Sequence, residues 1–258
     1  MKKVLIVCML LAAFALALAS CSGGEEGKKG STGLVYVSNG DGTCSVNGIG
    51  KCTDEEIIIP EKYRGDKVTS IADKAFRKCT SITGVTIGNN VTTIGYAAFD
   101  NCENLTSVII GEAVTSIGDY AFTSCVNIES IIIPDSVTTI GKNAFASNIK
   151  LVNLTLGKGL TSIGEWAFYG CRLENVIIPN GVTKIEPYTF CGCYYLETVT
   201  IPTSVTEIGT EAFSHSPKIR RVIYEGTVKQ WSKVTKGFYW IDKNGKGIIR
   251  CTDDEIRF

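Results

Sequence analysis

Apolar and polar residues along this chain follow a long period that repeats through most of its length. Successive phenylalanines are 23, 23, 23, 23, 22 and 23 residues apart, at Phe76, Phe99, Phe122, Phe145, Phe168, Phe190 and Phe213. An isoleucine lies five residues before each phenylalanine, and a threonine lies two residues before each isoleucine. Such a period is typical of repeat proteins, in which each short unit buries its apolar side against the next unit.

The second half of each unit predicts a strand. It reads apolar-x-x-apolar-x-apolar, as in Ile82-x-x-Val85-x-Ile87. Alternation and enrichment in Val, Ile and Thr favour a strand whose outer residues point inward, and Gly or Pro often follows as a turn signal. Each phenylalanine segment has room for a turn or so of helix. We therefore expect a mostly β fold with short helical turns, a solenoid of about seven coils of 22–23 residues over residues 68–225.

Both ends of the array need caps, because an open coil would expose apolar side chains and strand edges. Residues 34–67 are predicted to form an N-terminal β-rich cap and the first strand, with strands at Leu34–Val37 and Cys44–Val46. Residues 226–258 are predicted to form a C-terminal β-rich cap that begins with a short helix at Gly226–Trp231. The bulky run Phe238, Tyr239 and Trp240 is expected to cover the last coil.

The repeat unit resembles the BspA-type leucine-rich repeat, a family of cell-surface proteins. Its consensus is Leu-x-x-Leu-x-Leu/Ile-Pro…Val-Thr-x-Ile-Gly-x-x-Ala-Phe-x-x-Cys, and the resemblance runs from Ile57 to about Tyr224. Ala72 and Glu186 stand in place of the consensus glycine. The resemblance implies a leucine-rich-repeat solenoid and a role in adhesion through protein partners, such as host matrix proteins or other cell-surface proteins.

The N-terminus is predicted to be a lipoprotein signal peptide over residues 1–20. Lys2 and Lys3 precede the apolar run Val4–Leu18, which is short for a spanning helix of about 20 residues. Leu18-Ala19-Ser20-Cys21 resembles a bacterial lipobox, which implies that Cys21 is lipidated and becomes the first mature residue. An ordinary secretory signal with a cysteine nearby is the alternative. Residues 21–33 then form a lipidated flexible tether, and the anchor implies the bacterial outer membrane and cell surface.

Charge and chemistry narrow the function. The 258 residues carry 26 Lys and Arg against 26 Asp and Glu, which argues against nucleic-acid binding. One histidine, His215, argues against histidine-based catalysis and a multi-histidine metal site. Without a nucleophile–base pair or phosphate loop, we expect a monomeric non-enzyme with no cofactor and no metal.

The eleven cysteines sort by position in the repeat. One repeat position holds Cys79, Cys102, Cys125, Asn148, Cys171, Cys193 and Ser216. We expect these side chains to form a buried column that bonds the backbone of neighbouring loops, because their spacing is unlike that of metal ligands. Cys44, Cys52, Cys191 and Cys251 lie outside the column, and Cys44–Cys52 is the leading candidate for a disulfide.

A candidate binding face follows from the strand pattern. Outward residues of the main strands form one row of Thr86, Ile109, Ile132, Thr155, Ile177, Thr200 and Ile223. A row beside it varies in charge and includes Glu129, Glu174, Glu197 and Arg220. Exposed isoleucines can mark an interaction surface, but β-branched rows can also simply stabilise stacked strands.

Other features leave alternatives open. Tyr96, Tyr120, Trp166 and Tyr188 are predicted to cover the core beside the phenylalanines, or else to form a carbohydrate platform. Arg64-Gly65-Asp66 spells an integrin-type tripeptide, although Gly-Asp also suits a turn. The leading hypothesis is a surface-anchored lipoprotein whose solenoid is a protein-binding and adhesion module. The alternative is a carbohydrate-binding accessory lipoprotein of a glycan uptake system.

Overall fold

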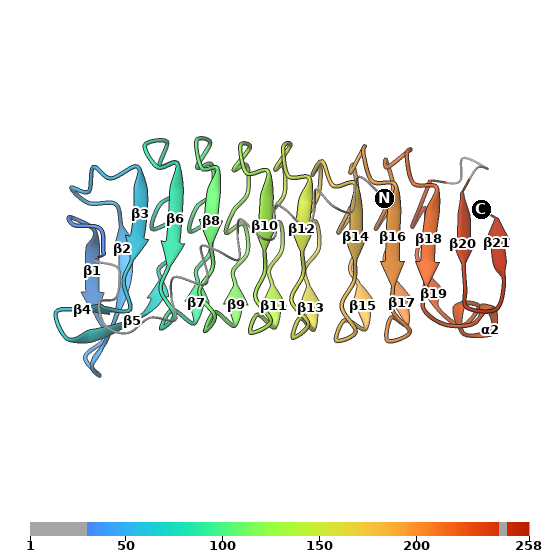
Figure 1. Ribbon diagram of the computed structural model, residues 1–258, viewed down its shortest axis with the longest axis horizontal. Helices are drawn as coiled ribbons and strands as arrows, with labels where there is room; N and C mark the ends of the chain where they lie inside the picture. The colour runs from blue at the N-terminus through green and yellow to red at the C-terminus, as the bar shows by residue number, and fades with distance from the viewer. Residues whose placement is uncertain (1–29, 243–246, 258) are drawn as a thin grey trace, which may run out of the picture.

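The computed structural model describes residues 30–242 and 247–257 as an elongated β-solenoid with coils stacked along its long axis (Figure 1). The predicted signal peptide and the predicted lipidation site Cys21 lie outside the described residues. Most coils contain one strand of three or four residues and one strand of two residues, and the two sets of strands run along opposite sides of the solenoid (Figure 1).

The longer strands form one face, which we call the long-strand face. Equivalent residues of successive coils lie opposite each other in parallel register, so that Val85 pairs with Val108. Val85 and Ile87 are buried while Thr86 between them is half-buried, as the alternation predicts. The strands of this face are β3 (Glu56–Ile59), β6 (Gly84–Ile87), β8 (Ser107–Ile109), β10 (Ser130–Ile132), β12 (Asn153–Thr155), β14 (Asn175–Ile177), β16 (Thr198–Ile201), β18 (Arg221–Tyr224) and β20 (Ile248–Arg250).

The shorter strands form a second parallel face, which we call the short-strand face. In nearly every two-residue strand the isoleucine of the Thr-x-Ile motif is buried and its neighbour is exposed or half-buried. The face consists of β5 (Asp66–Ile71), β7 (Thr93–Ile94), β9 (Ser116–Ile117), β11 (Thr139–Ile140), β13 (Ser162–Ile163), β15 (Lys184–Ile185), β17 (Glu207–Ile208) and β19 (Thr235–Lys236).

The segments around the phenylalanines form a third hydrogen-bonded row, which we call the turn row. Here a residue of one coil donates to the following coil, as Phe99 N–H does to the carbonyl of Ala121 at 2.7 Å. On the strand faces the direction is opposite, since Thr115 N–H donates back to the carbonyl of Thr92. Two residues of each turn have positive φ, at the positions two before and two after the phenylalanine. These left-handed residues interrupt any helix and let the chain reverse direction.

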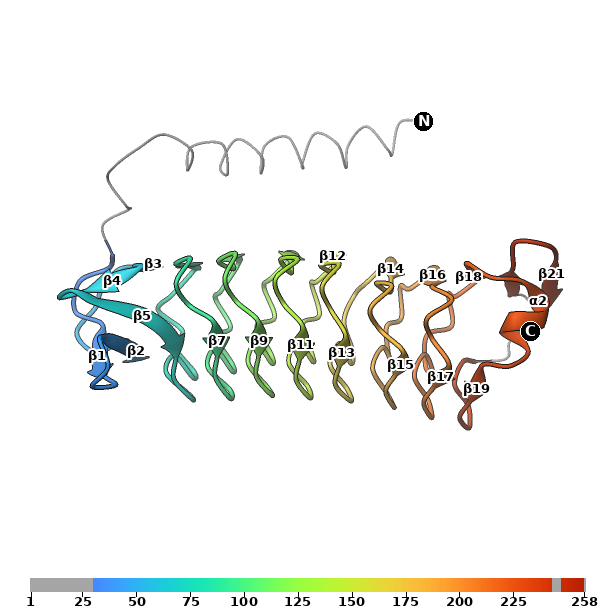
Figure 2. The same ribbon diagram turned by 90° about the horizontal axis from the view of Figure 1, so that it is seen from below.

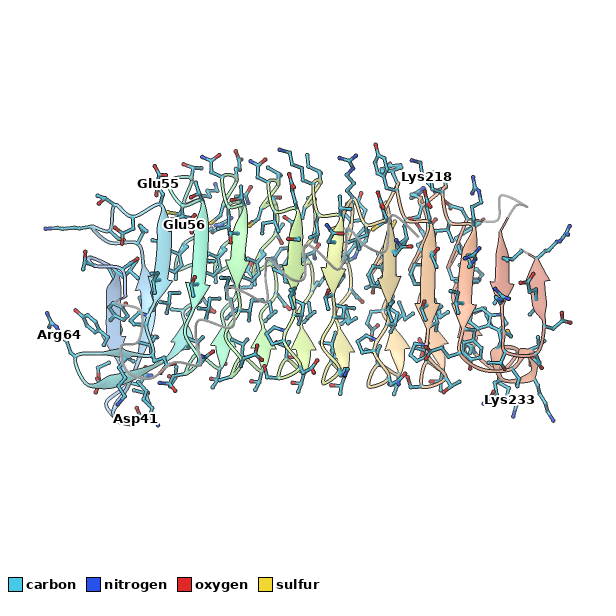
Figure 3. The ribbon with its side chains drawn as sticks, viewed as in Figure 1. Asp41, Glu55, Glu56, Arg64, Lys218 and Lys233 are labelled. Atoms are coloured by element: carbon cyan, nitrogen blue, oxygen red, sulfur yellow. The ribbon has the colours of Figure 1, made fainter. Side chains whose placement is uncertain are left out.

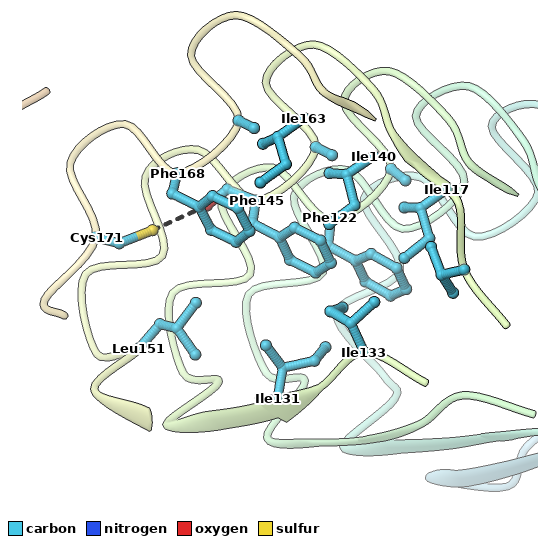
Figure 4. Close-up of a cluster of buried hydrophobic side chains, with 14 of the residues drawn as sticks. Ile117, Phe122, Ile131, Ile133, Ile140, Phe145, Leu151, Ile163, Phe168 and Cys171 are labelled. Atoms are coloured by element: carbon cyan, nitrogen blue, oxygen red, sulfur yellow. Dashed lines mark hydrogen bonds between the residues drawn. The ribbon is translucent and has the colours of Figure 1, made fainter. Parts of the chain in front are cut away.

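The core lies between these rows and is built around the stacked phenylalanines (Figure 4). Phe76 and Phe99 have ring centroids 5.0 Å apart and nearly parallel planes, and the stack continues at 5.0–5.4 Å to Phe213. All seven rings are almost fully buried. Each unit thus contributes one ring to a continuous stack that no single unit could bury, which is why the period is so constant.

The predicted cysteine column is confirmed. Cys171 donates from its sulfur to the carbonyl of Phe145 at 3.1 Å, and the other coils repeat this bond 25 or 26 residues apart (Figure 4). Asn148 and Ser216 make the equivalent bonds to Phe122 and Phe190. Cys79 is half-buried and contacts Ser81 at 3.3 Å instead. The column therefore closes each coil onto the turn row of the coil before it.

The solenoid has nine coils rather than the seven predicted, because segments assigned to the caps join the parallel ladders. At the N-terminal end β3 pairs in parallel with β6. At the C-terminal end β18 pairs in parallel with β20, and β17 with β19. These end coils lack the phenylalanine motif, so the repeat pattern does not count them.

The N-terminal cap is a set of short antiparallel strands. As predicted, β1 (Val35–Ser38) pairs with β2 (Thr43–Gly48), and β2 joins the solenoid by pairing in parallel with β5. β4 (Lys62–Tyr63) pairs with β5 as a hairpin. Residues 30–33, placed in the tether by the sequence, contact β3: Ser31 N–H donates to the carbonyl of Ile58 at 2.9 Å, and Ile58 N–H donates to the Ser31 hydroxyl.

The C-terminal cap contains the one helix of the described residues, α2 (Val228–Trp231), which Thr227 caps (Figure 2). Trp240 covers the end of the phenylalanine stack, edge-on to Phe213 at 6.4 Å. The expectation that Phe238 and Tyr239 help to cover the last coil is wrong, because they are 81% and 78% exposed. Cap strand β21 (Glu255–Arg257) pairs antiparallel with β20 and ends the sheet.

Candidate functional site

The long-strand face carries the outward row that the strand alternation predicts. Ile177 on β14 is 67% exposed and Ile132 on β10 is 37% exposed, with exposed Thr155 between them on β12. Thr86, Ile109, Thr200 and Ile223 are half-buried. The row is therefore most open at the middle coils, and Ile177 is its most exposed apolar side chain.

The second predicted row lies where the long strands begin. Glu129, Glu174, Glu197 and Arg220 are all exposed, each just before its strand. The backbone holds the row together, since Glu197 N–H donates to the carbonyl of Glu174 at 2.8 Å. Glu55 lies at the start of the same edge and Lys218 near its other end (Figure 3). The carboxylates of Glu129, Glu174 and Glu197 thus flank the isoleucine row, and Arg220 follows them toward the C-terminal end of the solenoid.

An aromatic and basic cluster at the same edge was missed by the sequence analysis. The Tyr195 ring lies between two cations, with Lys218 Nζ at 4.2 Å and the Arg172 guanidinium at 4.8 Å from its centroid. Tyr194 beside it is 61% exposed. The available signal was the pair Tyr194-Tyr195, which puts two aromatic residues at turn positions that hold no aromatic residue in the other coils, such as Glu103-Asn104. Tyrosine and arginine are enriched at binding hot spots.

The short-strand face differs in chemistry. Thr93 and Thr139 are exposed, and Thr139 donates from its hydroxyl to the Ser116 hydroxyl at 3.1 Å. A shallow hollow of about 570 Å³ over β9, β11 and β13 has the exposed ion pair Lys142–Glu165 at its edge. The outward residues of this face are polar, and they include the ion pair Lys184–Glu207, so the face offers little apolar contact area.

The aromatic residues beside the phenylalanines pack on one another. Trp166 and Tyr188 stack face to face at 4.0 Å, and both are half-buried. Tyr96 and Tyr120 meet edge-on at 5.7 Å. The Trp166–Tyr188 stack leaves each ring only one face for any other contact.

The Arg64-Gly65-Asp66 tripeptide lies at the hairpin between β4 and β5. Arg64 and Gly65 both have positive φ, which is the geometry of a two-residue hairpin turn. Arg64 projects from the end of the molecule (Figure 3), while half-buried Asp66 accepts a hydrogen bond from Ser38 at 3.3 Å. The hairpin turn is a sufficient reason for the Arg64-Gly65-Asp66 sequence, without a role in integrin binding.

The nine cysteines among the described residues are all free thiols, so the expected Cys44–Cys52 disulfide is not formed. Cys44 is buried in β2, whereas Cys52 is half-buried in the segment before β3. Cys191, outside the column, lies beside Glu211 and His215 of the next coil. Ligand atoms of Cys191, Glu211 and His215 all lie within 4.8 Å of one another.

The chain resembles known bacterial repeat proteins. The family model described as BspA type leucine rich repeat region matches in six copies over residues 50–146 and 115–235. The T. pallidum leucine-rich repeat protein TpLRR is 26% identical, with a TM-score of 0.69 over 74% of this chain and 90% of that chain. A leucine-rich cell surface protein of Faecalibacterium prausnitzii is 18% identical, with a TM-score of 0.42 over 83% of this chain and 98% of that one.

No curated protein matches this chain. Among the described residues, no helix has the length and apolar character needed to cross a bilayer.

Proposed function

The chain belongs to the family of BspA-type leucine-rich repeat proteins, and on that premise we propose that it is a surface-anchored lipoprotein whose solenoid binds protein partners through the long-strand face. Leucine-rich repeat domains serve in general as scaffolds for protein interactions rather than as enzymes. The observation that carries the choice of face is the exposure of Ile177, which is 67% exposed in a row whose other isoleucines are at most 37% exposed. A large apolar side chain on a rigid, flat sheet costs little conformational entropy to bind.

The surroundings of Ile177 support a protein partner. Glu174 and Glu197 flank the apolar row, and the Tyr195 cluster with Arg172 and Lys218 lies at the same edge of neighbouring coils. An apolar centre with a charged rim and a nearby tyrosine is the usual composition of a protein–protein interface. The short-strand face lacks such an apolar centre.

The anchor is proposed from the lipobox that ends at Cys21. Gly30 lies nine positions after Cys21, so the chain reaches at most about 30 Å between them. Residues 30–33 contact β3, at the N-terminal end of the solenoid. The lipid would therefore hold the N-terminal cap near the membrane and leave the middle coils free to meet a partner.

The test of the binding face compares two lysine substitutions in the full mature chain. Ile177→Lys places a charge at the proposed centre, and the matched control Thr93→Lys places one at an exposed position of the short-strand face. Binding is measured to a panel of purified extracellular matrix proteins and to intact host cells. We expect Ile177→Lys to weaken binding at least tenfold and Thr93→Lys to leave it unchanged, and equal effects of the two would contradict the assignment.

The test of the anchor is incorporation of a labelled fatty acid in cells, combined with protease treatment of intact cells. The native chain should be labelled and cleaved from outside, whereas Cys21→Ser should remain unlabelled. Labelling of Cys21→Ser, or complete protection of the native chain from protease, would contradict the anchored surface role.

A further inference from the structure

Three chemically distinct side chains meet on the turn row near the C-terminal end of the solenoid. They are the buried thiol of Cys191, the half-buried carboxylate of Glu211 and the exposed imidazole of His215, and one ligand atom from each lies within 4.8 Å of the others. His215 Nε2 and Glu211 Oε2 are 3.9 Å apart. We propose that these three residues form a binding site for a transition-metal ion, with Zn²⁺ the ion that best fits the ligands.

The fold explains why these residues meet. Glu211 and His215 are the two positive-φ residues on either side of Phe213, so the turn places both at one side of the same coil. Cys191 follows Phe190 in the preceding coil, and the two turns are joined by the bond from Phe190 N–H to the carbonyl of Ala212 at 2.8 Å. The site therefore rests on two adjacent, hydrogen-bonded turns.

The distances suit a metal after small side-chain rotations. Zinc binds sulfur at about 2.3 Å and histidine nitrogen or carboxylate oxygen at about 2.0–2.2 Å, which places ligand atoms of a tetrahedral site about 3.3–3.8 Å apart. The observed 3.9 Å between His215 and Glu211 is close to that separation. The side chains of His215 and Glu211 are 67% and 28% exposed, so both have room to rotate toward a metal ion. A water molecule would complete the fourth position.

The surroundings favour a cation. Asp242 lies close by, with its carboxylate held by the Ser214 hydroxyl at 3.1 Å and by Ser216 N–H at 2.9 Å. Burial, together with the negative charges of Glu211 and Asp242, raises the pKa of the Cys191 thiol to about 11. A bound Zn²⁺ would take the thiolate as ligand and release the thiol proton to solvent, and it would offset the charges of both carboxylates. Thiolate, imidazole and carboxylate together suit zinc better than calcium or magnesium.

The repeat itself supplies conservative test variants. Equivalent positions of other coils hold Ala146 for Cys191, Ala97 for Glu211 and Asn101 for His215. Cys191→Ala, Glu211→Ala and His215→Asn should therefore fold, since Asn also tolerates positive φ. Cys52→Ser, at the opposite end of the molecule, is the matched control for loss of a thiol.

The experiment uses the full mature chain, reduced and purified without a histidine tag. Zn²⁺ is measured by elemental analysis after dialysis, and Co²⁺ serves as a spectroscopic probe of thiolate ligation. We expect one equivalent of zinc, a thiolate-to-cobalt charge-transfer band and a rise in Tm with zinc, for the native chain and for Cys52→Ser. Each site variant should lose the stoichiometric zinc and the Tm rise, and Cys191→Ala should lose the band. Zinc retained by Cys191→Ala, or a cobalt spectrum of the native chain without thiolate character, would overturn the proposal.

Discussion

Asn148 donates a hydrogen bond at 3.0 Å to the carbonyl of Phe122, at the position where four other coils donate from a cysteine. Its amide also donates to the carbonyl of Phe145 at 2.9 Å, but its Oδ1 atom is buried without a partner. The column therefore tolerates an amide at the cost of one unpaired acceptor. A buried polar atom without a partner costs about 1–3 kcal/mol.

We expect Asn148→Cys to stabilise the protein. The thiol would make the same bond to Phe122 and remove the unpaired Oδ1, which should raise the free energy of unfolding by about 1 kcal/mol. Urea denaturation monitored by circular dichroism measures the change. The reciprocal variant Cys125→Asn should lower the free energy of unfolding by a similar amount, and a destabilising Asn148→Cys would contradict this reading of the column.

The C-terminal cap gives a second prediction. Trp240 is 7% exposed over the end of the phenylalanine stack, so Trp240→Ala should lower the free energy of unfolding by about 3–5 kcal/mol. Phe238→Ala is the control, because an 81% exposed ring contributes little and its loss should change stability by less than about 0.5 kcal/mol. Thermal or urea unfolding measures both changes, and a loss for Trp240→Ala as small as that expected for Phe238→Ala would show that the cap does not depend on Trp240.

Because several thiols are buried, we expect the free energy of unfolding to fall at alkaline pH. Burial raises the pKa of Cys171 from its ordinary value of 9.0 to about 12, and burial also raises the pKa of Cys125 and Cys193. Between pH 9 and 12 the unfolded chain loses the Cys171 proton while the folded chain keeps it, so the free energy of unfolding falls as pH rises. Each such thiol should contribute a slope of roughly 1 kcal/mol per pH unit in that window.

Urea midpoints measured between pH 7 and 10.5 test this slope. Cys171→Ser keeps a hydroxyl donor, as Ser216 does toward Phe190 at 3.3 Å, but has no group that titrates there. This variant should show a shallower decline above pH 9 than the native chain. An identical decline in both would mean that Cys171 does not carry the effect.

The sequence predicted the rows of the solenoid because each repeat position has one environment. A phenylalanine every 22–23 residues requires a stack, and the cysteine three residues later reaches the preceding carbonyl in each coil from Cys102 onward except where Asn148 or Ser216 replaces it. The number of coils was underestimated, because β3 and β20 pair in parallel without carrying the motif. The strands at the ends pair through backbone hydrogen bonds, which do not require the side chains of the repeat motif. The motif therefore gives no sign of these end coils in the sequence.

The functional residues were harder to predict. The position of Ile177 on the outward row followed from alternation, but its 67% exposure depends on how its neighbours pack. Phe238 and Tyr239 were assigned to the cap by bulk alone, whereas the turn at Glu211, whose N–H donates to the Phe238 carbonyl, leaves both rings in solvent. Glu211 and His215 lie 20 and 24 residues after Cys191 in the sequence. Only the register of adjacent turns shows that the three side chains meet.

Site-specific photo-crosslinking tests the proposed binding face most directly. A benzophenone amino acid is placed at Ile177 in one protein and at Thr93 in another, and both are irradiated on intact host cells or partner bacteria. Because Ile177 lies at the centre of the proposed interface, it should give a discrete adduct with a protein partner, and Thr93 on the short-strand face should give none. An adduct from Thr93 alone, or equal adducts from both positions, would contradict binding through the long-strand face.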